Sequence, residues 1–261
     1  MSELARGKKV YFASDSHFGV PSKEKSLERE RLFIKWLDEI KEDAAEIYLM
    51  GDLFEFWFEY KTVIQKGYVR LFGKLAEISD SGIPVCFFRG NHDVWAFDYF
   101  EKELNIKIYP DTLIKEIGNK TFFLGHGDGL GKGDNGYKFL KKVFRNRFNQ
   151  WLFRWVHPDI GTAMGLYWTE KSRAANVNKG LEEVNRAGIE RISGFCRSMI
   201  EKGEKIDYFI FGHIHKPNIE DINGKAKYFS IGDWITNFSY VVFDGEKVEL
   251  KYYKQALNVQ N

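Results

Sequence analysis

The stretch VYFASDSH, residues 10–17, joins a short apolar run to a polar cluster. The same succession returns at residues 47–52, where an apolar run ends at Gly-Asp, and at residues 85–93, where one ends at Gly-Asn-His-Asp. Short apolar runs that stop at turn residues are typical of strands buried on both faces of a sheet. We therefore expect three buried strands, each followed by polar side chains at its carboxyl end.

The segments between these runs have the spacing of amphipathic helices. Apolar residues recur on one face of residues 28–41, with charged residues opposite, and residues 66–79 repeat the pattern. Alternation of strands and helices predicts βαβ units and a parallel sheet. In such sheets ligands bind at the carboxyl ends of the strands, which is where the polar clusters lie.

Three further segments of the second half also predict strands. Residues 111–126 read as two strands around a Gly-Asn turn and end at Gly-His-Gly-Asp. Residues 207–211 are apolar and end at Gly-His-Ile-His, and residues 226–253 alternate apolar and polar residues as an antiparallel meander does. These segments belong with the first half in one core.

A helical segment interrupts that core. Residues 137–156 have helical apolar spacing with many aromatic and basic residues, and a second helical pattern covers about residues 170–202. The natural division is therefore a core made of residues 1–128 and 205–261 and an insertion at residues 129–204. We see no internal repeat and no low-complexity linker.

Composition excludes several classes of protein. The 261 residues carry 39 Lys and Arg against 37 Asp and Glu, so the net charge of +2 argues against a dedicated duplex-DNA binder. Two distant cysteines, Cys86 and Cys196, support neither a disulfide scaffold nor a cysteine-rich zinc module, and they favour a reducing compartment. The sequence has neither a signal-peptide pattern at its start nor an apolar stretch long enough to span a membrane.

The strand-end clusters form a set of candidate metal ligands. Five of the six histidines belong to these clusters, and residues i and i+2 of a strand point to the same side, so each D-x-H or H-x-H pair can serve one site. Carboxylate, amide and imidazole ligands without thiolate suit Mn, Fe, Zn, Ni or Co. Seven ligands are too many for one catalytic ion but fit two ions about 3.5–4 Å apart that share a carboxylate. The seven are Asp15, His17, Asp52, Asn91, His126, His213 and His215.

The order D-S-H, G-D, G-N-H-D, G-H-G-D, G-H-I-H resembles the signature of the calcineurin-like metallophosphoesterase family over the whole core. The resemblance implies an α/β fold, a four-layer αββα sandwich with a helical insertion as a lid. It also implies two divalent ions, with Mn²⁺ the expected metal, and Asp52 as the ligand that bridges them. One ion would be held by Asp15, His17 and His215, and the other by Asn91, His126 and His213.

The resemblance also implies catalytic roles for two further residues of the G-N-H-D motif. His92 matches the histidine that faces the phosphate and stabilises charge or assists the leaving group, and Asp93 would orient it. No covalent nucleophile is expected, since the chain has no G-x-S-x-G, Walker A or C-x-x-C motif.

The insertion is similar to that of the UDP-2,3-diacylglucosamine pyrophosphatase family of lipid A synthesis. The similarity lies in HGDGLGKGDNGY, in the basic aromatic helix and in an S-x-x-x-N-x-x-K helix face. It implies a dimetal hydrolase that cleaves UDP-2,3-diacylglucosamine to 2,3-diacylglucosamine 1-phosphate (lipid X) and UMP. The implied substrate contacts are Asn91, His92, Asp134, Ser172, Asn176, Lys179 and His213.

Three alternatives remain open at this stage. That family carries Arg at the position of His92, so a general metallophosphoesterase for another nucleotide or phosphoester is the second enzymatic hypothesis. A non-catalytic scaffold is the third, although such proteins lose ligands and this chain keeps all seven. A nucleic-acid-processing variant of the metallophosphoesterase family is a further alternative, which the net charge of +2 does not support.

The basic aromatic helix has two interpretations. Its aromatic residues form an apolar groove for acyl chains, with basic residues that attract an anionic membrane, or its aromatic face simply packs on the core. The first interpretation places the enzyme in the cytoplasm of a Gram-negative bacterium, peripheral on the cytoplasmic face of the inner membrane. We expect a nucleotide-linked lipid substrate, no nucleic acid and no obligate protein partner.

Overall fold

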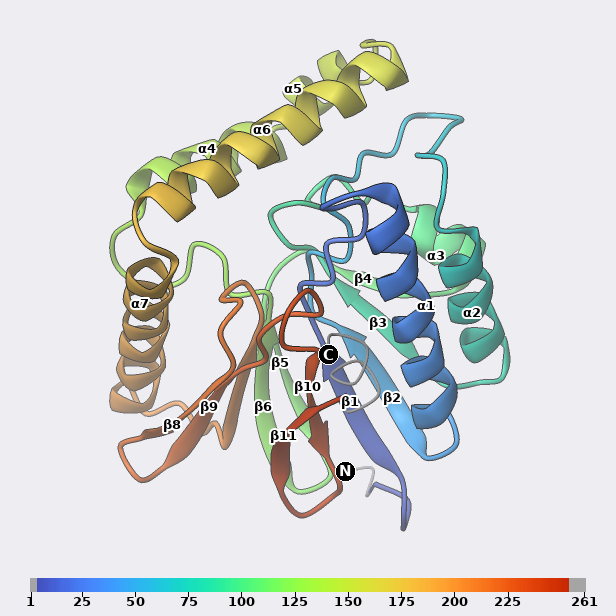
Figure 1. Ribbon diagram of the computed structural model, residues 1–261. Helices are drawn as coiled ribbons and strands as arrows, with labels where there is room; N and C mark the ends of the chain where they lie inside the picture. Colours follow the sequence, from blue (N-terminus) through green and yellow to red (C-terminus); the bar gives the residue numbers. More distant parts are fainter. Residues whose placement is uncertain (1–3, 254–261) are drawn as a thin grey trace.

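The computed structural model describes residues 4–253, in which two β-sheets stack face to face (Figure 1). The predicted core also includes residues 1–3 and 254–261, which lie outside the described residues. The first sheet has six strands in the order β11-β10-β1-β2-β3-β4, and β1 to β4 run parallel. Its strands are β1 (Lys9–Ala13), β2 (Ala44–Leu49), β3 (Val85–Phe88), β4 (Lys107–Tyr109), β10 (Ser239–Phe243) and β11 (Val248–Tyr252).

The second sheet has five strands in the order β5-β6-β7-β9-β8. β6, β7 and β9 run parallel, and β5 and β8 are antiparallel edge strands. The expected meander over residues 226–253 is therefore wrong, since β9 pairs with β7 while β10 and β11 join the other sheet. The strands are β5 (Leu113–Ile117), β6 (Lys120–Gly125), β7 (Tyr208–Phe211), β8 (Asn218–Ile222) and β9 (Ala226–Ser230).

Helices cover the outer faces of both sheets, which confirms the predicted four-layer α/β sandwich. α1 (Lys23–Ile40), α2 (Val69–Asp80) and α3 (Tyr99–Leu104) pack on the first sheet, and α7 (Leu181–Glu201) packs on the second (Figure 1). Aromatic side chains fill the space between the sheets. Phe12 of β1, for example, stacks on Phe122 of β6 with ring centroids 6.2 Å apart.

The remaining helices lie outside the sandwich, along the top of Figure 1. They are α4 (Asn135–Arg145), α5 (Arg147–Phe153) and α6 (Pro158–Asn178). A single helix over residues 137–156 is therefore wrong. Asn146 interrupts it with extended backbone, and its side chain caps α5 by accepting hydrogen bonds from the amides of Phe148 and Asn149.

The helical pattern at residues 170–202 is likewise divided between two helices. α6 ends at Asn178 and α7 begins at Leu181, after Gly180, whose φ of 82° lies in the left-handed region that favours glycine. In the described part of the chain, no helix is both long and apolar enough to cross a membrane.

Candidate metal centre

The loops that follow five strands of the two sheets meet at one end of the sandwich, because parallel strands carry their carboxyl ends to the same edge. The backbone amides of Asp15 and His17 donate to the carbonyls of Gly51 and Asp52, at 3.1 and 3.0 Å. The amide of His213 donates to the carboxylate of Asp15 at 2.9 Å. These bonds join the loops after β1, β2 and β7 into one rigid frame.

Several residues of this frame have unusual backbone conformations. Asp15, His17, Asp52 and His213 have φ values of 55°, 43°, 52° and 67°, in the left-handed region. Each such non-glycine residue costs of order 1–3 kcal/mol, and residues of this kind cluster at functional sites. All four were predicted as ligands from the sequence.

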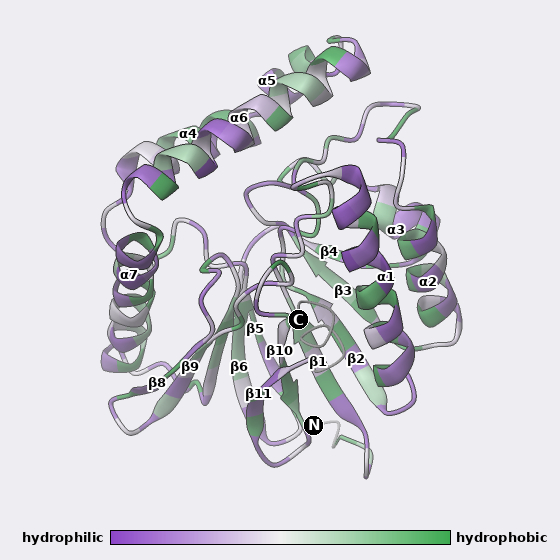
Figure 2. Ribbon diagram, viewed as in Figure 1, coloured by the Kyte–Doolittle hydropathy of each residue, from purple (hydrophilic) through white to green (hydrophobic). Residues whose placement is uncertain are grey.

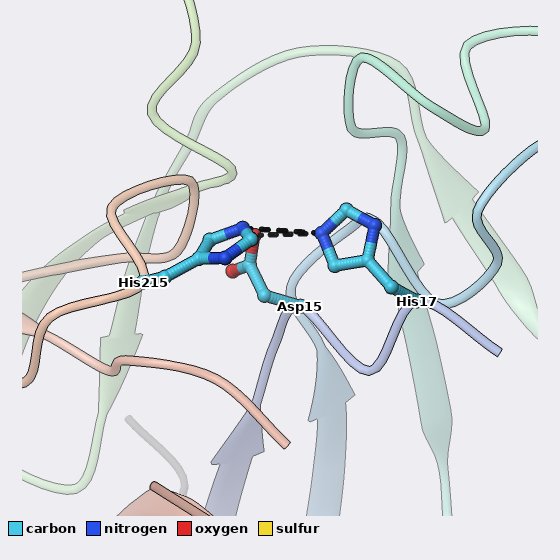
Figure 3. Close-up of side chains that lie close together, drawn as sticks. All are labelled: Asp15, His17 and His215. Atoms are coloured by element: carbon cyan, nitrogen blue, oxygen red, sulfur yellow. Dashed lines mark hydrogen bonds and ion pairs between the residues drawn. The ribbon is translucent and has the colours of Figure 1, made fainter. Parts of the chain in front are cut away.

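The first group of ligand-type side chains consists of Asp15, His17 and His215 (Figure 3). Nε2 of His17 lies 3.2 Å from Nε2 of His215, and Oδ1 of Asp15 lies 3.3 Å from Nε2 of His215. That Oδ1 atom is buried and accepts no hydrogen bond within residues 4–253. Two imidazole nitrogens and an unpartnered carboxylate oxygen that converge in this way fit a divalent cation.

The second group consists of Asp52, His126 and His213. Nε2 of His126 lies 3.2 Å from both Oδ2 of Asp52 and Oδ1 of Asn91. Oδ2 of Asp52 also lies 3.7 Å from Nε2 of His17, a member of the first group. Asp52 therefore stands between the two groups, as a bridging carboxylate must, and all seven predicted ligands are brought together.

Mutual electrostatics shift the pKa values of the buried ligands. Burial disfavours the imidazolium of His17, but the nearby carboxylates of Asp15 and Glu55 favour it and raise its pKa to about 9. For His126 burial is likewise outweighed, and the charge of Asp52 raises the pKa to about 10. Metal binding needs neutral imidazoles, so a cation would compete with these protons for the same nitrogen atoms.

The two motif residues next to Asn91 lie in the same frame. Nδ1 of His92 donates to the backbone carbonyl of Glu55 at 2.7 Å, and Nε2 of His92 lies 4.0 Å from Oδ2 of Asp52. The buried carboxylate of Asp93 accepts from the amides of Leu53 and Gly90, at 2.8 and 2.7 Å. Asp93 thus ties together the loops after β2 and β3, and the hydrogen bond that orients His92 goes to Glu55.

Four of the predicted substrate contacts lie on the insertion, while Asn91, His92 and His213 lie at the metal centre. Asp134 precedes α4, and its carboxylate lies 3.2 Å from Nη1 of Arg191. Ser172 and Asn176 lie on α6, and Lys179 follows it directly; Ser172 and Lys179 are exposed and Asn176 is half-buried.

Several buried groups of the site were not predicted. Glu55 bonds Nδ1 of His17 at 3.0 Å, and Arg173 of α6 bonds Glu55. Asp128 bonds Nζ of Lys141 at 2.6 Å, and Asp233 accepts several amides of the loop that faces His215. For Glu55 a signal existed, because a lone carboxylate in the apolar stretch LFEFWF must find a partner once it is buried.

A family model and several known proteins match most of this chain. The model of the family "Calcineurin-like phosphoesterase" matches residues 8–217. A UDP-2,3-diacylglucosamine hydrolase of Porphyromonas gingivalis is 34% identical over 93% of this chain and 97% of that protein. One of Proteus mirabilis is 28% identical over 84% and 89%. The solved structure of Yfce, a phosphoesterase from E. coli, covers 97% of this chain and 95% of that chain at 19% identity and a TM-score of 0.46.

Proposed function

The chain belongs to the calcineurin-like phosphoesterase family, and on that premise we propose that it hydrolyses the pyrophosphate bond of UDP-2,3-diacylglucosamine. The products are 2,3-diacylglucosamine 1-phosphate and UMP, which is a step of lipid A biosynthesis. One observation carries the phosphohydrolase chemistry, namely two neighbouring, largely buried groups of ligand-type side chains with Asp52 between them. The relatives named for this activity, which align with most of the chain, support the substrate.

We propose that the chain holds two divalent ions and that both are Mn²⁺. Bound there, such ions supply Lewis-acid polarisation of the phosphoryl oxygens and lower the pKa of water. The donor set of oxygen and nitrogen atoms, without thiolate, fits this assignment. One ion would lie among Asp15, His17 and His215, the other among Asn91, His126 and His213, with Asp52 between them.

His92 is proposed to act on the phosphate directly. Its Nδ1 proton is committed to the Glu55 carbonyl, so the ring presents Nε2 toward the centre. An anionic phosphate at Nε2 would favour the protonated ring, which would then donate a hydrogen bond to the phosphate. Asp93 would support this geometry indirectly, by holding the loop that carries His92.

The insertion, residues 129–204, is proposed to select the substrate. Ser172, Asn176 and Lys179 are spaced four and three residues apart and so share one helical face. Lys179 would meet phosphate charge, while Ser172 and Asn176 would bond sugar or acyl amide. Asp134, at the start of α4, would contact the substrate from the other side of the insertion.

The insertion also carries the surface that we propose for acyl chains and for the membrane. Phe144 and Phe153 pack on Trp95, so part of the aromatic face does cover the core. Trp151 and Trp155, by contrast, are 51% and 76% exposed. Figure 2 shows hydrophobic and hydrophilic segments side by side on these helices, an arrangement that suits peripheral association with the cytoplasmic face of an inner membrane.

Release of UMP tests the proposal. The purified protein, loaded with Mn²⁺, is incubated with UDP-2,3-diacylglucosamine in detergent, and UMP is measured by chromatography. The deacylated nucleotide sugar is the control, and we expect it to react much more slowly. Equal rates on both would favour the general metallophosphoesterase, and no phosphatase activity with any divalent ion would favour the non-catalytic scaffold.

Binding to vesicles tests the membrane proposal separately. Replacing Trp151 and Trp155 by serine should reduce sedimentation of the protein with anionic vesicles. The same change at Val69, which is 77% exposed on α2, is the matched control and should leave sedimentation unchanged.

A further inference from the structure

Arg173 of the insertion helix α6 forms an ion pair with a buried carboxylate of the core. Its Nε and Nη2 atoms donate to the two oxygens of Glu55, at 2.9 and 2.5 Å, across 118 residues of sequence. The Glu55 side chain is 1% exposed and that of Arg173 is 35% exposed. A planar guanidinium that uses two donors on one carboxylate fixes both partners in orientation as well as in distance.

The Glu55 carboxylate also forms a hydrogen bond with the predicted metal ligand His17. Oε2 of Glu55 accepts a hydrogen bond from Nδ1 of His17 at 3.0 Å, which leaves Nε2 of His17 to face Asp15 and His215. Outer partners of this kind set the orientation of a ligand imidazole and the nitrogen that it presents to a cation. Arg173 therefore contacts Glu55, and Glu55 in turn contacts the predicted metal ligand His17.

α6 also touches the segment that carries Glu55 at two other points. A β-carbon added at Gly161 would lie 2.2 Å from the hydroxyl of Tyr60, and one added at Gly165 would lie 2.3 Å from the ring of Phe56. Glycines at these two positions allow the helix backbone to lie directly on the loop after β2. Residues 161, 165, 172 and 176 follow one another at helical spacing, so Ser172 and Asn176 lie on the same face of α6 as the two glycines.

We propose that Arg173 is a positioning residue for the phosphohydrolase reaction. Through Glu55 it fixes the His17 imidazole, and it also sets α6 beside the metal centre. The proposal rests on the proposed function. It explains why this helix carries an arginine at position 173, because a lysine ammonium is a point charge that cannot hold both carboxylate oxygens in one plane.

The test replaces Arg173 by glutamine or lysine in the full chain. Calorimetry measures Mn²⁺ affinity, and hydrogen–deuterium exchange measures the protection of α6; neither requires substrate. For Arg173→Gln we expect Mn²⁺ affinity to fall by about 10–100-fold. We also expect faster exchange over residues 166–178 and a lower kcat. For Arg173→Lys we expect smaller changes in the same directions.

Lys171 provides the matched control on the same helix. Its ammonium lies 4.8 Å above the Tyr167 ring. Lys171→Gln removes the same charge two residues away, and it should leave metal affinity, exchange and kcat at wild-type values.

Two outcomes would overturn the proposal. One is a folded Arg173→Gln protein with wild-type Mn²⁺ affinity and wild-type exchange over α6. If the glutamine variant does not fold, Arg173→Lys decides, and wild-type values there would also overturn it. Failure of the proposed function has a different signature: wild-type protein would release no UMP while the Arg173 variants still changed metal affinity and exchange.

Discussion

Replacing Gly90 by alanine tests whether Asp52 must lie where the structure places it. A β-carbon at residue 90 would lie 2.1 Å from Oδ1 of Asp52 and 2.6 Å from its backbone nitrogen. The carboxylate must therefore move by about 1 Å before the contact approaches van der Waals separation. A misplacement of about 1 Å at a reacting centre costs on the order of 100-fold in rate, so we expect turnover to fall by about that factor.

The cost to stability should be smaller. Overpacking of this kind costs about 1–3 kcal/mol, which a folded protein of this size can tolerate. Gly73→Ala is the matched control, since no neighbouring atom lies within 4 Å of a β-carbon built there on α2. It should raise the free energy of unfolding by about 0.5–1 kcal/mol, because alanine favours a helix interior over glycine.

Three measurements on the two variants decide the matter. Turnover of bis-p-nitrophenyl phosphate reports the chemistry, calorimetry reports Mn²⁺ affinity, and urea unfolding reports stability. A folded Gly90→Ala protein with the turnover and metal affinity of the wild type would refute the reasoning. Asp52 would then tolerate displacement, and its position between the two ligand groups would have no functional meaning.

Three further predictions concern the metal, the carboxylate of Asp52 and the core. Chelation should abolish turnover and lower Tm, and added Mn²⁺ should reverse both, since a ligand at 100 times its Kd stabilises the fold by about 2.7 kcal/mol. Asp52→Asn should keep the circular dichroism spectrum of the wild type but lose at least about 100-fold in turnover. Ile192→Ala should cost about 2–5 kcal/mol in urea unfolding, because this side chain is fully buried between α7 and the second sheet, and it should leave Mn²⁺ affinity unchanged.

The convergence of the candidate ligands could be predicted from the sequence because these residues follow strands directly. Asp15, Asp52 and Asn91 lie just beyond β1, β2 and β3, and the geometry of a parallel sheet brings such positions together. The apolar runs identify the strands, so the pattern alone indicates both the strand ends and the residues that converge there.

Strand partners were harder to predict, because an alternating pattern does not say which strand lies alongside. Residues 226–253 contain the expected strands, yet β10 pairs with β1 whereas β9 pairs with β7. Local sequence also failed at Asn146, where one asparagine ends one helix and caps the next. Strand pairing depends on contacts that are distant in sequence, and the helix break at residue 146 depends on the local backbone conformation. A similar hydrophobic pattern is compatible with more than one outcome in each case.

The pair Glu55 and Arg173 shows the same limit within the site. The sequence indicates that Glu55, in an apolar stretch, needs a partner, but Arg173 reads as an ordinary charged position, and 118 residues separate the two. The ion pair between them forms only when α6 lies against the loop after β2, and Gly161 and Gly165 allow that close approach. Contacts that depend on docking of this kind cannot be predicted from one sequence.

The candidate centre buries several carboxylates, and this burial costs free energy of folding. Asp15, Asp52 and Glu55 are almost fully buried, and a buried ion costs several kcal/mol unless it finds partners. Glu55 has His17 and Arg173, but Oδ1 of Asp15 accepts no hydrogen bond from any described residue. Left-handed backbone at four of the candidate ligands adds further strain. Positive groups of the centre, Arg173 and the imidazoles of His17 and His126, offset part of these costs, and a divalent cation would place further positive charge beside Oδ1 of Asp15.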